Sequence, residues 1–421
     1  MTQAKMANSI NQSSTFNVSA VRADFPIFAE KTGQPVLHYL DSAATNQKPQ
    51  SVIDAIIDVF SRYNAPVHRG LYRNSALATE AYHAARANVA QFINATSDEI
   101  IFTASTTASL NTIAQGFYAN KLKPGDKVWV TRLEHHANYL PWQKVCEATG
   151  AELCMIELDD NYQLDLDRYP DLFSNETKVI ATTMVSNVLG VMVPVADICQ
   201  RAREFNIAVV VDAAQAALTK SIDVQSIDCD FLVFSGHKVF GPDGIGVLYA
   251  KRQHIEAMDP WLVGGGMVDF INKHFLDTQW SEGVNKFEAG SPNLSGAVGL
   301  SAAIDYIQSF NQDDMVSHVK AVSEYAYQRL SEFSQITLLT PANASQSGIV
   351  CFNHNVIHAH DIAQLTADNN VAIRAGHHCA QPLLDSLNCF STLRASFSIY
   401  NSTDNVDALI DALDQAEELF L

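Results

Sequence analysis

Residues 230–238 read Asp-Phe-Leu-Val-Phe-Ser-Gly-His-Lys, an apolar run that leads directly into a small polar residue, a glycine, a histidine and a lysine. The run at 230–234 has the length and apolarity of a buried strand. Such a strand places the amine of Lys238 at the carboxyl edge of a sheet, where open α/β folds bind their ligands. An amine there can be desolvated and become nucleophilic, so Lys238 is a candidate former of a Schiff base. A surface lysine that follows a strand is the alternative.

Apolar runs on both sides of this stretch alternate with helical patterns. The predicted strands cover 100–103, 127–131, 151–158, 178–185, 207–211, 230–234 and 246–250. The predicted helices between them include 138–149, 166–173 and 195–205. Alternation of this kind predicts an α/β fold with a mostly parallel sheet that helices cover on both faces.

The two ends of the chain differ from this alternating region. Residues 1–20 are polar and predict a tail, followed by a short helix near 21–26, a strand at 36–40 and helices at 51–63 and 76–93. After 290–292 the predicted elements are helices at 299–309 and up to 333, strands at 336–339 and 348–353, and a final helix at 406–420. We therefore expect an N-terminal segment at 1–34 that packs on a small α+β domain at 300–421, and a large domain at 35–299.

The composition argues against several kinds of partner. Lys and Arg number 27 against 46 Asp and Glu, which gives a net charge of −19. That charge disfavours nucleic acid and anionic membranes as partners. No apolar run approaches the roughly 20 residues of a membrane helix, and residues 1–17 lack the apolar core of a signal peptide. The 7 cysteines include no Cys-x-x-Cys pair, which favours reduced thiols and a cytoplasmic location.

An acidic residue shares the predicted sheet edge with Lys238. Asp212 ends the apolar run 209–211. Pyridoxal phosphate needs such a pair, because a lysine holds its aldehyde and a carboxylate keeps its ring nitrogen protonated. Gln215 would then reach the ring hydroxyl. A helix N-cap is the ordinary alternative for Asp212.

Two further stretches follow strands at the same edge. Ser105-Thr106-Thr107 enters a helix and offers hydroxyls and backbone N–H groups to a phosphate, although ordinary helix capping explains it equally well. In the stretch 134–138, Glu-His-His-Ala-Asn, the imidazole of His135 can stack on a flat ring and pass protons. A metal site is the alternative for the adjacent histidines, but no acidic or cysteine cluster supports it.

The stretch 374–380 reads Arg-Ala-Gly-His-His-Cys-Ala. Glycine and histidines around Cys379 predict a mobile loop with an activated thiol, because nearby positive or proton-accepting groups favour the thiolate. A buried free cysteine beside surface histidines is the alternative, and a zinc site lacks two further ligands. Arg374 and Arg394 are the only arginines after residue 341. A guanidinium suits a substrate carboxylate, and a structural ion pair is the alternative for each.

Together these stretches resemble the cysteine desulfurases, pyridoxal-phosphate enzymes of the class V aminotransferase group. The chain is most similar to their second subgroup, the SufS and CsdA enzymes, which are also described as selenocysteine lyases and cysteine sulfinate desulfinases. The likeness runs from about residue 21 to the final helix, and its specific motifs lie at 235–242, 287–293 and 374–382. It implies a fold-type I pyridoxal-phosphate-dependent transferase, with a large mostly parallel α/β/α sheet domain and a smaller α+β C-terminal domain.

The resemblance implies a role for each candidate residue. Lys238 binds pyridoxal 5'-phosphate covalently, Asp212 pairs with its pyridinium nitrogen and Gln215 with its ring oxygen. His135 stacks on the ring and transfers protons, and Cys379 takes the sulfur. The phosphate group is held by Thr107, Ser235, His237 and the partner subunit's Ser291. The substrate carboxylate is bound by Asn187 and Arg394, with Arg374 as a further active-site arginine.

Two positions depart from the family pattern. Ser291 stands where members often have threonine, which keeps the hydroxyl. Ala108 stands where members often have an acidic residue, and this removes any contact across the dimer that the acid would make.

The implied reaction converts L-cysteine to L-alanine. Freed Lys238 removes the α-proton, and the Cys379 thiolate attacks the β-sulfur and keeps it as a persulfide. A sulfur-acceptor protein then takes the sulfur for iron–sulfur cluster assembly or related sulfur metabolism. Selenocysteine and cysteine sulfinate are further candidate substrates, and the resemblance implies a homodimer. Two alternatives stay open: transamination or β-elimination without a persulfide, and a non-catalytic scaffold that carries sulfur or binds partners.

Overall fold

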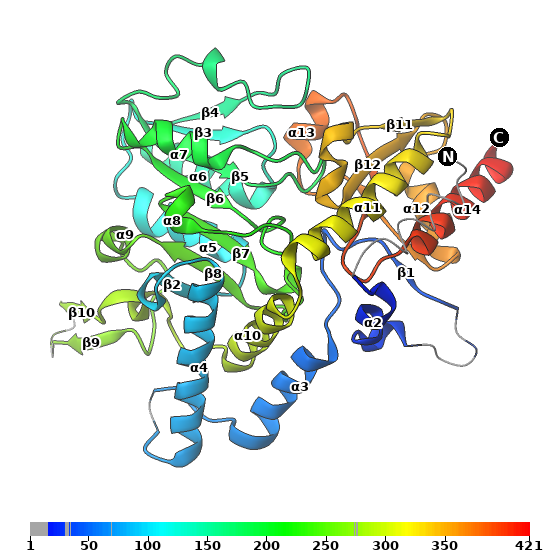
Figure 1. The fold of residues 1–421 in the computed structure, drawn as a ribbon. Coiled ribbons are helices and arrows are strands. Elements are labelled where there is room, and N and C mark those ends of the chain that lie inside the picture. Colours follow the sequence, from blue (N-terminus) through cyan, green and yellow to red (C-terminus); the bar gives the residue numbers. More distant parts are fainter. Residues whose placement is uncertain (1–15, 30–32, 34, 69, 273, 275–276) are drawn as a thin grey trace.

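Two sheets, joined by long helices, organise the chain (Figure 1). The computed structural model describes residues 16–29, 33, 35–68, 70–272, 274 and 277–421. In Figure 1 the larger sheet lies on the left and the smaller on the right. The region between them contains the ends of the larger sheet's parallel strands.

The larger sheet has seven strands in the order β2-β8-β7-β6-β5-β3-β4. The strands are β2 (Ile100–Thr103), β3 (Lys127–Thr131), β4 (Glu152–Ile156), β5 (Thr177–Thr183), β6 (Ala208–Asp212), β7 (Phe231–Ser235) and β8 (Gly246–Ala250). Neighbours from β7 to β4 are parallel, whereas β8 is antiparallel to both β2 and β7. The predicted mostly parallel sheet is therefore confirmed, with each strand end within two residues of its predicted place.

Apolar side chains of this sheet alternate between two core clusters. Val209 and Val211 of β6 pack into one cluster, and Val210 packs into the other. The alternation follows from the two-residue period of a strand, which points successive side chains to opposite faces. Helices α4, α7 and α10 contribute residues to the first cluster, and α5, α6 and α9 to the second. These helices are α4 (Arg73–Phe92), α5 (Thr106–Ile113), α6 (Leu140–Thr149), α7 (Val195–Arg203), α9 (Arg252–Ala257) and α10 (Leu294–Gln308).

The remaining helices of this part are α3 (Gln50–Asp58) and α8 (Val224–Ile227). Single turns of π-helix extend α3 to Tyr63 and α5 to Tyr118, so the predicted helices in these regions are confirmed. The helix predicted at 166–173 is wrong, because only a 3-10 turn forms at Leu166–Arg168. Tyr169 is extended, as expected for a residue that precedes a proline.

The smaller sheet is antiparallel, in the order β11-β12-β15-β14. Its strands are β11 (Ile336–Leu338), β12 (Ile349–His354), β14 (Arg374–Gly376) and β15 (Thr392–Ser396). β1 (His38–Tyr39) pairs in parallel with β13 (Val371–Ala372). The helices of this part are α11 (Gln312–Leu330), α12 (Ala359–Asp368), α13 (Gln381–Ser386) and α14 (Thr403–Phe420). The predicted elements at 336–339, 348–353 and 406–420 are confirmed, whereas β13, β14, β15, α12 and α13 were not predicted.

The segment before β1 contacts residues near the C-terminal end of the chain. Helix α2 (Val18–Ala23) carries Arg22, whose guanidinium donates to the carbonyl of Tyr400 at 3.3 Å. Phe25 is fully buried and meets the ring of Tyr400 edge-on, with 4.9 Å between centroids. Most of the predicted tail, residues 1–15, lies outside the described residues. The division into 1–34, 35–299 and 300–421 stays a prediction.

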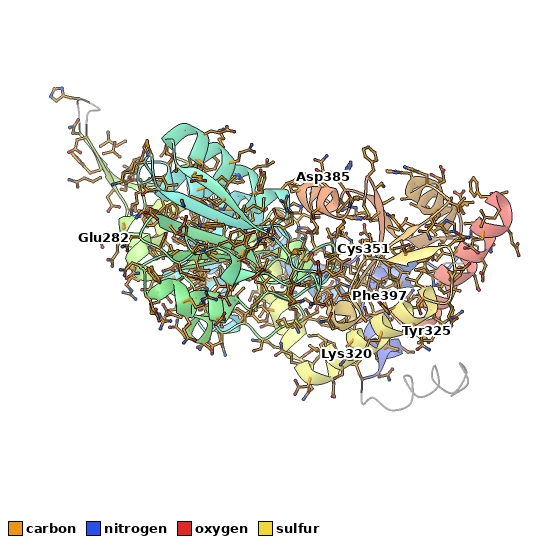
Figure 2. All side chains as sticks on the ribbon, turned by 90° about the horizontal axis from the view of Figure 1, so that it is seen from above. Glu282, Lys320, Tyr325, Cys351, Asp385 and Phe397 are labelled. Carbon is orange, nitrogen blue, oxygen red and sulfur yellow. The ribbon has the colours of Figure 1, made fainter. Side chains whose placement is uncertain are left out.

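A hairpin that the sequence did not predict projects from the larger sheet region (Figure 1). It consists of β9 (Val268–Ile271) and β10 (Thr278–Trp280). Figure 2 places Glu282, just after β10, at the opposite end of the molecule from Tyr325 of α11. Within the described ranges, no helix is long and apolar enough to cross a membrane. All 7 cysteines are free.

Candidate functional site

A cavity of about 220 Å³ lies between the carboxyl ends of the parallel strands and the smaller sheet. Eleven of the twelve predicted site residues line it, and Ser291 does not. The eleven are Thr107, His135, Asn187, Asp212, Gln215, Ser235, His237, Lys238, Arg374, Cys379 and Arg394. The topology therefore brings together side chains that lie hundreds of residues apart in the sequence.

Lys238 ends a 3-10 turn that directly follows β7. Burial lowers the pKa of its amine to about 8; the charges of Arg394 and Arg374 act in the same direction, and Asp212 opposes them. An amine with this pKa has a substantial neutral fraction near pH 8, which a nucleophile or a base requires. The alternative of a surface lysine is wrong, because Lys238 lines the cavity.

Asp212 ends β6 and is 5% exposed. One of its carboxylate oxygens accepts the N–H of Ala214 at 2.9 Å, so the local capping contact exists as well. Burial raises the pKa of Asp212, while the Ala214 N–H and the charge of Lys238 oppose the rise. A buried carboxylate of this kind is stabilised by a cationic N–H partner, which a protonated ring nitrogen would provide.

His135 lies at the start of the 3-10 turn His136–Asn138. Its Nδ1 accepts the N–H of Ala137 at 3.0 Å. Burial, followed by the charge of Lys238, lowers the pKa of His135 to about 4. The imidazole is therefore neutral at pH 7, with its proton on Nε2, and it presents an uncharged ring to the cavity.

The sequence reasoning missed Glu134, which fixes the loop that carries His135. Its carboxylate accepts the N–H of Thr183 at 2.8 Å and the side-chain amide of Asn138 at 2.6 Å. Thr131 adds a third hydrogen bond at 2.5 Å. Glu134 thus ties the end of β3 to the end of β5. Burial raises its pKa to about 8.

The candidate phosphate turn lies across the start of β8. The side chain of Ser105 accepts the N–H of Ala108 at 3.2 Å, so the predicted cap of α5 is confirmed. Thr106, which the sequence reasoning did not select, donates its N–H to the Ser235 hydroxyl at 2.8 Å, and the two hydroxyls lie 2.7 Å apart. This close approach needs Gly246, where a Cβ would lie 2.5 Å from the backbone of Ser105.

Arg394 of β15 is 2% exposed and contacts both sides of the cavity. It donates to the carbonyl of Asn187 at 2.8 Å and to the carboxylate of Asp41 at 3.1 Å. Arg374 pairs with the same carboxylate at 3.8 Å, so the ion-pair alternative is present for both arginines. The Nε of Arg394 is buried without a partner among the described residues. Arg394 also lines the cavity, where a guanidinium suits a substrate carboxylate.

Cys379 follows β14 in the loop that leads to α13. Its side chain is exposed, so the alternative of a buried cysteine is wrong. The side-chain amide of Asn187 donates to the carbonyl of His378 at 2.8 Å. This hydrogen bond ties the loop to the larger sheet region and places the thiol at the cavity that also holds Lys238.

A family model described as Aminotransferase class-V matches residues 38–409. The chain belongs to the class V aminotransferases. This family membership confirms the predicted resemblance, and the fold class with it.

Individual relatives support the assignment to this family. The chain is 41% identical to a cysteine desulfurase of Haloferax volcanii, over 98% of this chain and 99% of that relative. It is 42% identical to a probable cysteine desulfurase of Halalkalibacterium halodurans, over 96% and 99%. The crystal structure of the cysteine desulfurase CsdA from Escherichia coli superposes with a TM-score of 0.89 and 38% identity, over 97% of this chain and 100% of that one.

The donor set of this class V aminotransferase fits pyridoxal phosphate. The cavity offers a desolvated amine, a buried carboxylate and a neutral imidazole, on Lys238, Asp212 and His135. The hydroxyls of Thr107 and Ser235 lie at the N-terminal end of α5, where helix N–H groups favour an anion. Each chemical part of the cofactor therefore has a matching group in the cavity.

Ser291 lies outside the cavity, and the family resemblance assigns its phosphate contact to the partner subunit. It lines a separate hollow of about 610 Å³ together with Val59, Phe60 and Leu294. Its predicted role stays a prediction.

Proposed function

We propose that this chain is a pyridoxal-phosphate-dependent cysteine desulfurase that converts L-cysteine to L-alanine and keeps the sulfur as a persulfide on Cys379. The observation that carries the proposal is the cavity that Lys238, Asp212 and Cys379 line together. A buried amine and carboxylate suit many reactions of amino acids, whereas a thiol at the same cavity suits sulfur transfer. The cysteine desulfurase names of the relatives support this choice.

Pyridoxal phosphate, when bound, supplies an electrophilic carbon for the substrate amine and an electron sink for the charge that develops next to it. Lys238 would hold its aldehyde, Asp212 its ring nitrogen and Gln215 its ring oxygen, with His135 against the ring. The phosphate would be held by Thr107, Ser235 and His237, with the partner subunit's Ser291. The substrate carboxylate would be held by Arg394 and Asn187, with Arg374 nearby.

Two neutral nitrogens are suited to moving protons. With a pKa of about 8, the Lys238 amine is partly neutral and accepts the α-proton of L-cysteine once it is free. The Nδ1 of His135 is occupied by the N–H of Ala137, so proton exchange with the substrate takes place at Nε2. The Glu134 hydrogen bonds hold this loop in place.

Cys379 supplies the step that distinguishes desulfuration. Its thiolate attacks the β-sulfur, so a sulfur–sulfur bond forms while the carbon–sulfur bond of the substrate breaks. L-cysteine and the Cys379 thiol together give L-alanine and a Cys379 persulfide, and no oxidant or reductant is needed. Because the Cys379 side chain is exposed, the persulfide is accessible to an acceptor.

The proposal includes a wider setting. The enzyme works in the cytoplasm as a homodimer and passes its sulfur to an acceptor protein for iron–sulfur cluster assembly or related sulfur metabolism. Selenocysteine and cysteine sulfinate are further substrates. Phe60, which is exposed and lines the hollow that contains Ser291, supports a second copy at this face. The proposal also keeps the division of the chain into an N-terminal segment at 1–34, a large domain at 35–299 and a small domain at 300–421.

The test is mass spectrometry of the protein after incubation with L-cysteine, with L-alanine assayed in parallel. We expect one extra sulfur atom on the Cys379 peptide and release of alanine. Cys379→Ala should abolish both and keep the cofactor. Cys389→Ala is the matched control, because it removes a second partly exposed thiol of the same region and should keep both. Alanine or pyruvate without sulfur on Cys379 would favour a lyase or aminotransferase reaction instead.

A further inference from the structure

The loop that carries Cys379 has an unfavourable backbone conformation. His378 and Cys379 have φ angles of 51° and 54°, which place two consecutive residues with side chains in the left-handed region. In this region the Cβ of an L-residue approaches the following carbonyl oxygen, so the conformation persists only where surrounding contacts hold it. The contacts of the loop therefore decide where the thiol lies.

Two of these contacts come from a single residue, His136. Its backbone N–H donates to the carbonyl of Cys379 at 2.7 Å. Its imidazole Nε2 accepts the N–H of Gln381 at 3.2 Å. The two hydrogen bonds hold the loop at Cys379 and again two residues later. Asn187 adds a third bond, to the carbonyl of His378.

The side chain of His136 is directed to this loop and not to the cavity. The lining of the cavity includes His135 and Ala137, the two neighbours of His136 in the sequence, and omits His136 itself. Burial lowers the pKa of His136, and His377 adds to this effect. The ring is therefore neutral near pH 7, and Nε2 keeps the lone pair with which it accepts the Gln381 N–H.

We propose that His136 is a positioning residue for Cys379, and that its imidazole and its backbone N–H together hold the thiol where it meets the substrate sulfur. The inference rests on the proposed function, in which Cys379 attacks that sulfur. The two adjacent histidines then have separate tasks. His135 serves the cavity, and His136 serves the loop.

A comparison of L-cysteine with cysteine sulfinate distinguishes a residue that positions Cys379 from a residue that only stabilises the fold. Desulfuration of L-cysteine needs the Cys379 thiolate, because that thiolate accepts the sulfur. Cysteine sulfinate can lose its sulfur as sulfur dioxide, giving alanine without any thiol. A displaced Cys379 loop should therefore slow turnover of L-cysteine and spare turnover of cysteine sulfinate.

The experiment compares the wild-type holoenzyme with three variants. His136→Ala removes the Nε2 acceptor but keeps the backbone N–H, and His136→Gln offers a carbonyl oxygen in place of Nε2. His360→Ala is the matched control, because this exposed histidine lies on α12, outside the cavity lining. The readouts are kcat for L-cysteine, kcat for cysteine sulfinate, and amide hydrogen exchange of the peptide that covers residues 377–384.

We expect His136→Ala to lower kcat for L-cysteine about tenfold, the effect of losing one hydrogen bond worth about 1.4 kcal/mol. Its kcat for cysteine sulfinate should stay within about twofold of the wild type, because that reaction does not use the Cys379 thiol. Exchange at Gln381 should become faster. His136→Gln should recover most of the lost turnover, and His360→Ala should match the wild type in every readout.

Three results would overturn the inference: an unchanged L-cysteine kcat in His136→Ala, an equal fall for both substrates, or unchanged exchange at Gln381. If His136→Ala fails to fold, the comparison of His136→Gln with the wild type still decides the question. If the His136→Gln variant showed faster exchange at Gln381 but a wild-type kcat for L-cysteine, this result would contradict the inference. Normal L-cysteine turnover by Cys379→Ala would instead contradict the proposed function. Even then, hydrogen exchange at Gln381 would still test whether His136 holds the loop.

Discussion

Replacing Gly246 by alanine should disturb both stability and cofactor binding. Gly246 starts β8, pairs with Thr103 of β2 and Ser235 of β7, and lies against the backbone of Ser105. A Cβ at this position would lie 2.5 Å from the carbonyl carbon of Ser105 and 2.6 Å from its Cα. Carbon atoms in ordinary contact lie about 3.5–4.0 Å apart, so the turn must move by about 1 Å.

A movement of this size has a calculable effect. The two hydrogen bonds between Thr106 and Ser235, at 2.8 and 2.7 Å, would lengthen beyond the range of a hydrogen bond. Each is worth about 1 kcal/mol, and crowding in a packed region adds roughly 1–3 kcal/mol. We therefore expect the free energy of unfolding to fall by about 3–5 kcal/mol. The affinity for pyridoxal phosphate should fall at least about tenfold, because the displaced turn begins the helix end that we propose holds the phosphate.

The assays are urea unfolding of the enzyme and spectroscopic titration of the apoenzyme with pyridoxal phosphate. Gly265→Ala is the matched control, because a Cβ there would meet no atom within 4 Å. A Gly246→Ala variant that is as stable as Gly265→Ala and binds the cofactor equally well would refute the reasoning.

Three further predictions concern buried ionisable groups. Arg394→Lys keeps the charge and loses the planar fork of N–H donors, so KM for L-cysteine should rise about tenfold or more; an unchanged KM in steady-state assays would contradict this. Glu288→Gln leaves Arg86 buried without its carboxylate, since the two side chains are 8% and 4% exposed. Urea unfolding should then show a loss of about 3 kcal/mol, and a loss below about 1 kcal/mol would argue against it. Burial, followed by the charge of Arg394, lowers the pKa of His378 to about 3. The His378 imidazole therefore stays neutral in the native state, whereas in the unfolded state it takes up a proton below about pH 6.5. As the pH decreases below this value, the free energy of unfolding should decrease by up to about 1.4 kcal/mol per pH unit. His378→Asn should reduce this slope between pH 6.5 and 5.0, and equal slopes would rule the explanation out.

The sequence predicted the larger sheet and the groups at its carboxyl edge. Fully buried strands are short apolar runs, and parallel strands end at one common edge, so local patterns alone are enough to place Asp212 and Lys238 together. For Cys379, only the resemblance of its motif to a family predicted that the thiol belongs to the active site. In the structure, Cys379 lines the same cavity as Lys238.

The residues that hold the site in shape were harder to predict. Asp41 pairs with both Arg374 and Arg394, which lie in a distant part of the chain, and it was not selected from the sequence. Glu134 stabilises its loop through hydrogen bonds to Thr183, which follows 49 residues later. Local patterns carry no signal for such contacts, because they arise only when the sheet assembles. The wrong helix at 166–173 has a local cause, the proline after Tyr169.

The order in which the cavity residues are synthesised has its own consequence. The lining draws on positions from Ala43 to Arg394, and Arg394 follows Lys238 by 156 residues. A ribosome needs roughly 10–30 s to add that length of chain. For most of this interval the nascent chain already carries the reactive lysine but lacks Arg374 and Cys379, and Arg394 is added only at its end. Cofactor capture in the finished geometry must therefore wait until Arg394 has been added to the chain.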